Sequence, residues 1–298
     1  EQNLVNNNVS ALNGESSGMT SANLVLSDLT RAVPYDSYSF SFDGSLDYIS
    51  IGSSVPTSNQ HTVSTWIKSN DLTNSAIGYL FTTETTIKGI GLDEGDGAFG
   101  AGKFYYWNGS SPTVVSTTAI TVNNWHHIAF VFDSTTNEIK FYLDGNLDKT
   151  TSVSIGTAAN IKIIGSYNGT LHYLNGKLSN MSIFNEALTS TEVFKLYANG
   201  VPQDLANFTP QPVAWYPLGS NSFWNGSQWT VRDMIGSNDG TGQNIGVDGL
   251  VGDAPRSEAN GTGTNMDIPT NLEGSTKWSS NNSWSINMSS TARVEDTP

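Results

Sequence analysis

The stretch WHHIAFVFDSTTNEIKFYLDGNL, residues 125–147, decides the fold class. It holds two runs rich in aromatic and β-branched residues, separated by a short polar turn and followed by an Asp-Gly dipeptide. In the second run Ile139, Phe141 and Leu143 occupy every other position, so an extended chain places them on one face. The stretch therefore predicts two antiparallel strands, the second with one buried face.

The same pattern continues on both sides of this stretch. Residues 40–52, 61–69, 103–109 and 176–184 are further short runs of aromatic and β-branched residues, and Asn-Gly and Asp-Gly turns punctuate the series. The composition agrees, because 13% of the residues are charged while 29 are glycine. We expect an all-β protein built as an antiparallel sandwich of two sheets.

One short helix interrupts the strands. Thr189 and Glu192 have the spacing of a capping box, and Val193 and Leu196 lie on one face of the helix that would follow. Gly200 stands where a residue that ends a helix belongs. The pattern predicts a short amphipathic helix on the rim of the sandwich.

Charge and cysteine content exclude several classes of function. The formal net charge of −14 repels phosphate backbones and anionic lipids, so neither nucleic acid nor a membrane is expected as a partner. The absence of cysteine excludes disulfides, thiolate metal sites and a cysteine nucleophile. The sequence contains no run of about 18 apolar residues, so it predicts no membrane-spanning helix.

The sequence divides into four parts. We expect an extended N-terminal arm over residues 1–36, a jelly roll over 37–200 and a proline-rich linker over 201–212. We expect residues 213–298 to form a β and coil tail or a small β-lobe, which could also supply a strand to the sandwich.

Five segments, spread over residues 38–198, resemble the laminin G-like, concanavalin A-like jelly-roll family. They are FSFDGSLDYISIG, HTVSTWIKS, NNWHHIAFVFD, IKFYLDGNL and GKLSNMSIFNEALTSTEVFKLY, in the order that the family shows. The resemblance implies a two-sheet sandwich with Trp66 and Trp125 as core anchors, and His126 and His127 match a frequent Trp-His-His run. The tail and GESSGMTSANLVLSDLT also resemble structural proteins of marine bacteriophages.

The position of VAWYPL, residues 213–218, raises a question of topology. In the resembled family such a strand opens the domain, whereas here it follows the jelly roll. Residues 16–28 align without gaps beside 241–253 as a weak internal repeat. A sandwich that lacks an outer strand exposes an unpaired edge. VAWYPL would fill that edge in its own chain or in a neighbouring subunit, or else belong to a separate lobe.

Two clusters of acidic residues are candidate calcium sites, because Ca²⁺ binds clustered carboxylates and backbone carbonyls from loops. The first cluster is Asp43 and Asp47, and the second is Asp93, Glu94 and Asp96. Solvated acidic turns are the alternative.

Glycan-cleaving enzymes of this fold place alternating carboxylates on one strand. Glu94 and Asp96 come nearest, two positions apart, but glycines break the run and indicate a turn. No nucleophile elbow is present either, so we expect no enzyme.

A sugar site needs an aromatic ring beside a polar side chain in a loop. Tyr106, Trp107 and Asn108 form the best such group, and Tyr167 and Asn168 form the second. The alternative is that Trp107 caps a hairpin or lies in a subunit contact.

Together these observations predict a non-enzymatic structural protein of a virion or another extracellular surface, such as a phage decoration protein. It would self-associate through arms and β-edges, bind other virion or surface proteins, and contact host-surface glycans through its loops. The alternative function is a secreted calcium-dependent lectin or polysaccharide-binding module.

Overall fold

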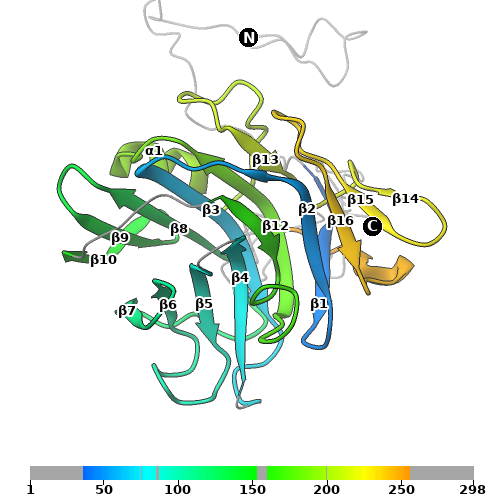
Figure 1. The fold of residues 1–298 in the computed structure, drawn as a ribbon, viewed down its shortest axis with the longest axis horizontal. Helices are drawn as coiled ribbons and strands as arrows, with labels where there is room; N and C mark the ends of the chain where they lie inside the picture. Colours follow the sequence, from blue (N-terminus) through cyan, green and yellow to red (C-terminus); the bar gives the residue numbers. More distant parts are fainter. Residues whose placement is uncertain (1–35, 75, 85–86, 153–159, 199, 256–298) are drawn as a thin grey trace, which may run out of the picture. The chain divides into compact units, whose positions relative to one another are not determined.

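The computed structural model describes residues 36–255 except 75, 85–86, 153–159 and 199. Residues 1–35 of the predicted arm and 256–298 of the predicted tail lie outside the described residues. The described chain is all-β, with two antiparallel sheets packed face to face and one α-helix (Figure 1). This confirms the sandwich that the alternating apolar runs predicted.

The first sheet has eight strands in the order β10-β9-β8-β3-β12-β1-β17, with β13 also pairing with β12. Its strands are β1 (Ser39–Asp43), β3 (Gln60–Ser69), β8 (His126–Asp133), β9 (Glu138–Leu143), β10 (Asn146–Ser152), β12 (Asn175–Phe184), β13 (Ala214–Tyr216) and β17 (Leu250–Val251). The deciding stretch forms β8 and β9, which pair from Ile128 opposite Leu143 to Asp133 opposite Glu138.

The second sheet has nine strands in the order β14-β15-β16-β2-β11-β4-β5-β6-β7. Its strands are β2 (Tyr48–Val55), β4 (Ile77–Thr83), β5 (Gly89–Asp93), β6 (Phe104–Trp107), β7 (Pro112–Val115), β11 (Ile161–Ile164), β14 (Phe223–Trp224), β15 (Trp229–Val231) and β16 (Gly240–Gln243). A short 3₁₀ turn, Val247–Gly249, separates β16 from β17.

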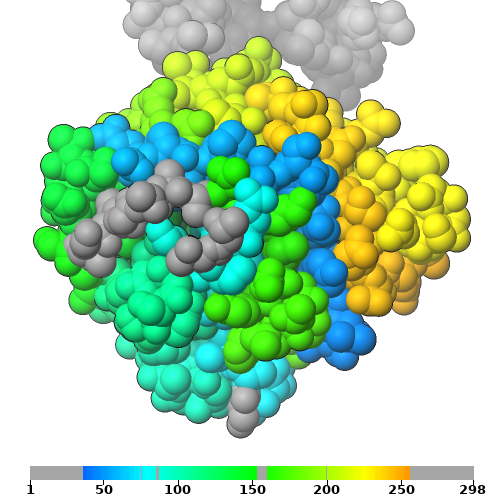
Figure 2. Space-filling model, in the orientation of Figure 1, coloured from blue at the N-terminus to red at the C-terminus, as the bar shows by residue number. Residues whose placement is uncertain are grey.

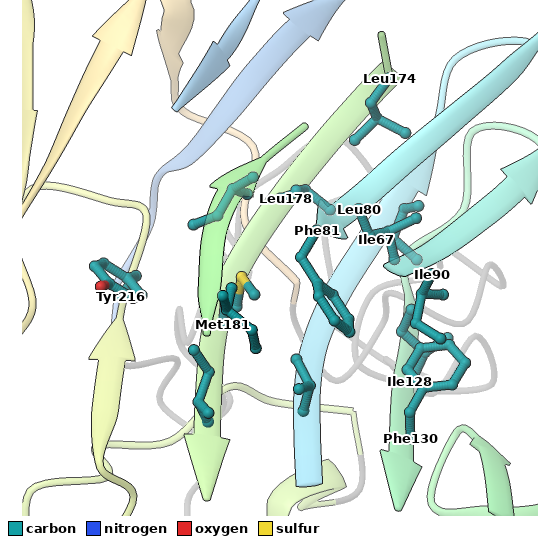
Figure 3. Packing of buried hydrophobic residues seen from close by; sticks show 14 of the residues in the cluster. Ile67, Leu80, Phe81, Ile90, Ile128, Phe130, Leu174, Leu178, Met181 and Tyr216 are labelled. Carbon is teal, nitrogen blue, oxygen red and sulfur yellow. The ribbon is translucent and has the colours of Figure 1, made fainter. Parts of the chain in front are cut away.

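The main core lies between the two sheets. Ile67, Ile128 and Phe130 of the first sheet face Phe81 and Ile90 of the second, and all five side chains are buried (Figure 3). Edge-to-face ring pairs across the sheets, such as Phe104 with Phe130, 6.1 Å apart, add to this contact. Strand alternation places these residues on the inner faces, as the period of two requires.

Helix α1 (Ser190–Tyr197) packs on the outer face of the first sheet. Thr189 caps it, and the reciprocal bonds between Thr189 and Glu192 confirm the predicted capping box. Val193 and Leu196 join a second buried cluster with residues of β8 and β9. The left-handed residue that ends the helix is Ala198, so the prediction that Gly200 has this role is wrong.

The predicted anchors Trp66 and Trp125 are both buried, but neither belongs to the cluster between the sheets. Trp66 stacks on Tyr197 of α1, with ring centroids 5.7 Å apart. The indole of Trp125 donates a hydrogen bond to Asp253. Both rings therefore fasten peripheral segments to the sandwich.

Residues 213–251 add strands to both sheets of their own chain. Met181 of β12 pairs with Tyr216 of β13, and Phe40 of β1 pairs with Leu250 of β17. Strand β16 pairs with β2 in the other sheet, and Figure 2 shows this C-terminal segment against the N-terminal strands. The described part of the segment therefore extends the sandwich and is not a separate lobe.

Asp253 fastens the end of this segment. Its carboxylate accepts hydrogen bonds from Lys68 (3.0 Å), Lys177 (2.5 Å) and Trp125 (3.1 Å), and its carbonyl accepts one from Ser39 (2.6 Å). Burial acts to raise the pKa of Asp253, but the hydrogen bonds outweigh it and lower the pKa to about 2.

No helix among the described residues is long and apolar enough to cross a membrane.

Candidate functional site

An aromatic pocket of about 280 Å³ opens on the outer face of the nine-stranded sheet. It is lined by Ile77, Tyr79, Phe99, Tyr105, Trp107, Pro112, Tyr167 and His172. Tyr79 and Tyr105 are buried and form its floor, while His172 is exposed at its rim. The lining comes from β4, β6, β7 and two loops (Figure 1).

Alternation along β6 decides which of its rings reach this pocket. Phe104 and Tyr106 point into the core, where Tyr106 meets Phe132 edge to face at 5.1 Å. Tyr105 and Trp107 point the other way and line the pocket. Tyr106, predicted as a sugar contact, is therefore a core residue. Its neighbour Tyr105 lines the pocket instead.

Gly91 of β5 leaves room for the pocket floor. Gly91 pairs with Tyr79 on one side and Tyr105 on the other, and Gly89 pairs with Trp107. A Cβ atom on Gly91 would lie 2.3 Å from the Tyr105 ring, which no real side chain tolerates. The absence of a side chain lets the rings of Tyr79 and Tyr105 meet edge to face, 5.8 Å apart.

The loop after β11 forms another wall. The backbone N–H of Tyr79 donates to the carbonyl of His172 (3.2 Å), which ties this loop to β4. The Tyr79 ring then lies 5.1 Å from Tyr167 and 6.0 Å from His172. Asn168, predicted with Tyr167 as a sugar contact, has φ of 60° in the turn and does not line the pocket.

The loop after β5 positions Phe99. Both carboxylate oxygens of Asp93 accept backbone hydrogen bonds, from Gly95 and Gly97 on Oδ1 and from Phe99 and Gly100 on Oδ2. Burial acts to raise the pKa of Asp93, but these four bonds outweigh it and lower the pKa. The ordered loop places the Phe99 ring 4.4 Å from Tyr105.

This geometry bears on the second predicted calcium cluster. Asp93 directs its oxygens at N–H groups, and Asp96 Oδ1 accepts from the backbone of Ala98 (2.8 Å). Glu94 points inward: its Oε1 accepts from Asn175 N–H, and its Oε2 has no hydrogen-bond partner among the described residues. Burial raises the pKa of Glu94 to about 7.

The first predicted cluster is also engaged in turns. Asp43 accepts from the N–H of Ser45 (2.6 Å), and Asp47 accepts from the N–H of Asp43 (3.2 Å). Burial raises the pKa of Asp47 to about 6. Within the described ranges, no three His, Asp or Glu side chains gather to hold a metal ion. Calcium binding therefore stays a prediction.

The third residue of the best predicted sugar group has a structural role. Asn108 Oδ1 accepts hydrogen bonds from the backbone of Ser110 and Ser111, both 3.0 Å, so it stabilises the β6–β7 turn. It does not line the pocket. Trp107 does, and its buried Nε1 has no hydrogen-bond partner among the described residues.

A serine and histidine elsewhere in the first sheet resemble catalytic partners in distance alone. Ser64 Oγ lies 2.7 Å from His127 Nε2, and both residues are buried. Asp144 accepts from the backbone N–H of His127 and not from its ring. The arrangement lacks the carboxylate that orients the base in a Ser-His-Asp triad.

Sequence reasoning missed most of the lining. Tyr79, Phe99 and His172 lie in three separate segments, and only strand pairing brings them together. Tyr105 could have been found, because it shares the alternation of Trp107, whereas Tyr106 does not.

Three comparisons relate the chain to known proteins. A family model described as the concanavalin A-like lectin/glucanases superfamily matches residues 43–194, about half of the chain. A search of curated proteins finds no match.

Among solved structures, a candidate carbohydrate-binding protein from Bacteroides ovatus has a TM-score of 0.55 and 18% identity over 72% of this chain. The match spans 59% of that protein's own chain. A heptameric SAP-like pentraxin from Limulus polyphemus gives a TM-score of 0.45 and 20% identity, over 68% of this chain and 95% of its own. A Ruminococcus gnavus sialidase module bound to sialyllactose gives a TM-score of 0.37 and 15% identity, over 54% of this chain and 99% of its own.

Proposed function

The chain belongs to the concanavalin A-like lectin/glucanase superfamily, and from this premise we propose that it is a non-enzymatic glycan-binding module that uses its aromatic pocket. The observation that carries the proposal is a group of aromatic rings on the outer face of a sheet. A sugar packs its C–H face on such rings, while hydroxyl and ring N–H groups orient it.

The shape of the pocket supports this function. Phe99, Trp107 and Tyr167 are half-buried walls above the floor of Tyr79 and Tyr105. A volume of about 280 Å³ lies just below the range for drug-sized ligand sites, roughly 300–1,000 Å³, which suits a small ligand of one or two sugar rings. The fold it shares with the candidate carbohydrate-binding protein is consistent with this function.

The predicted role in a virion finds no support in the fold or in the comparisons. The strand VAWYPL, which that prediction offered for assembly, pairs with β12 of its own chain. Self-association, a virion location and calcium dependence stay predictions.

Binding to a glycan array, followed by titration calorimetry with each sugar that binds, tests the proposal. Replacing Trp107 or Tyr167 by alanine should weaken binding about tenfold or more, because each ring contributes about 1–2 kcal/mol of contact. Phe223→Ala is the matched control, since Phe223 is 58% exposed and lies outside the pocket. Binding that survives both pocket substitutions would contradict the proposal.

A further inference from the structure

The charges around the aromatic pocket are unequal in sign. No lysine or arginine is among its lining residues, and His172 is the only one of them that can become a cation. Burial lowers the pKa of His172, which favours its neutral form, although Asp96 opposes the shift. Lys103 comes directly before β6, two positions before Tyr105, and does not line the pocket.

Two carboxylates stand at the end of β5 and in the loop that carries Phe99, and neither is itself a lining residue. Asp93 ends β5 and holds the loop that carries Phe99, and Asp96 is an exposed residue of that loop. The Asp93 carboxylate accepts from the N–H of Phe99 (2.8 Å), whose ring lies 4.4 Å from Tyr105, and Asp96 precedes Phe99 by three positions. A ligand in the pocket therefore meets negative charge from the loop and the negative faces of aromatic rings.

We propose that the pocket selects sugars by charge, binding a sugar with a protonated amine most tightly and an acidic sugar least. This inference rests on the proposed function and names its ligand class. A cation near aromatic faces is attracted by their quadrupoles, and the attraction strengthens when water is excluded. An anionic sugar meets the same rings and Asp96 with the opposite sign, and the net charge of −14 adds to its repulsion.

The effect should be measurable as a ratio of affinities. Cation–π contacts of ordinary strength correspond to about a 2- to 30-fold preference for the amino sugar over its neutral counterpart. Asp96 is exposed, so its share should be about two- to fivefold and should fall as salt is added.

The experiment uses the full chain and three methyl glycosides that differ in one substituent. These are a neutral hexoside, the corresponding 2-amino-2-deoxyhexoside and the corresponding hexuronide, each in the gluco and galacto configuration. Calorimetry at about pH 6.5 keeps the amine charged. Trp107→Ala should weaken the binding of every probe that uses the pocket about tenfold or more.

Asp96→Asn and Asp204→Asn form a matched pair. Both carboxylates accept a hydrogen bond from the N–H two residues later at 2.8 Å, and both residues are exposed. Neither lines the pocket, but Asp96 belongs to the loop that carries the lining residue Phe99, whereas Asp204 does not. Asp96→Asn should reduce the preference for the amine and leave neutral binding unchanged. Asp204→Asn should change neither, although it removes the same charge.

The outcomes separate the two proposals. Tightest binding of the amino sugar, weakened by Asp96→Asn alone, supports charge selection. Neutral and acidic sugars that bind through Trp107 as tightly as the amino sugar overturn charge selection and leave the proposed function standing. Failure of all six glycosides and of the glycan array overturns both.

Discussion

Removing the charge of Asp253 should loosen the C-terminal segment from the sandwich. Lys68, Lys177 and Trp125 all donate to this carboxylate from β3, β12 and the residue before β8. In Asp253→Asn both ammonium groups lose their counter-charge. The hydrogen bonds from Lys68 and Lys177 to residue 253, which follows β17, therefore weaken.

The pKa gives the size of the effect. A fall from 3.8 to about 2 corresponds to about 2 kcal/mol at neutral pH, at 1.36 kcal/mol for each unit. Because the folded pKa is the lower one, this stability is present above about pH 4 and is lost as the pH falls through about 2. Asp253→Asn should therefore cost about 2 kcal/mol at pH 7, or about 4–8 °C in Tm.

Urea unfolding followed by tryptophan fluorescence, repeated from pH 7 to pH 2.5, measures this. The difference between wild type and Asp253→Asn should shrink to about a third at pH 2.5, since Asp253 is then protonated in the unfolded chain and partly in the folded one. Asp204→Asn is the control for net charge, because Asp204 is exposed and its side chain accepts from Ala206 within its own turn. A difference that stays constant with pH, or a variant as stable as wild type at pH 7, would contradict this prediction.

Two further predictions concern β5 and its end. Burial raises the pKa of Glu94 to about 7, so its stabilising contribution is full below about pH 4.5 and is lost as the pH rises through about 7. Glu94→Gln should therefore stabilise the fold by about 1–3 kcal/mol at pH 8 and change little at pH 4, as urea unfolding at both values will show. Gly91→Ala should push Tyr105 aside and weaken sugar binding about tenfold by calorimetry, whereas Gly252→Ala, whose nearest neighbour would be 4.0 Å away, should not.

Local signals of the sequence were sufficient for the secondary structure. Alternation in residues 138–143 marked β9, and the spacing of Thr189 and Glu192 marked the start of α1. These signals are reliable because a strand or a cap depends on neighbours within a few positions. The end of α1 was misplaced, since Ala198 adopts the left-handed conformation that glycine usually supplies.

The candidate site was only half visible. Trp107 and Tyr167 were predicted as sugar contacts and do line the pocket, but Tyr106 was chosen where Tyr105 belongs. Strand alternation predicts that Tyr105 and Tyr106 face opposite sides of the sheet, but it does not predict which side faces the core. That depends on the partner sheet, where Phe132 receives Tyr106.

The sequence by itself determined the all-β class, the strands, the helix cap and the acidic charge, because each follows from local pattern or composition. Only the tertiary structure decided that residues 213–251 complete both sheets of their own chain. It also decided that Tyr79, Phe99 and His172 meet at one pocket. Both depend on pairing between segments far apart in sequence, where the free energy comes from shared burial and hydrogen bonding that no single segment contains.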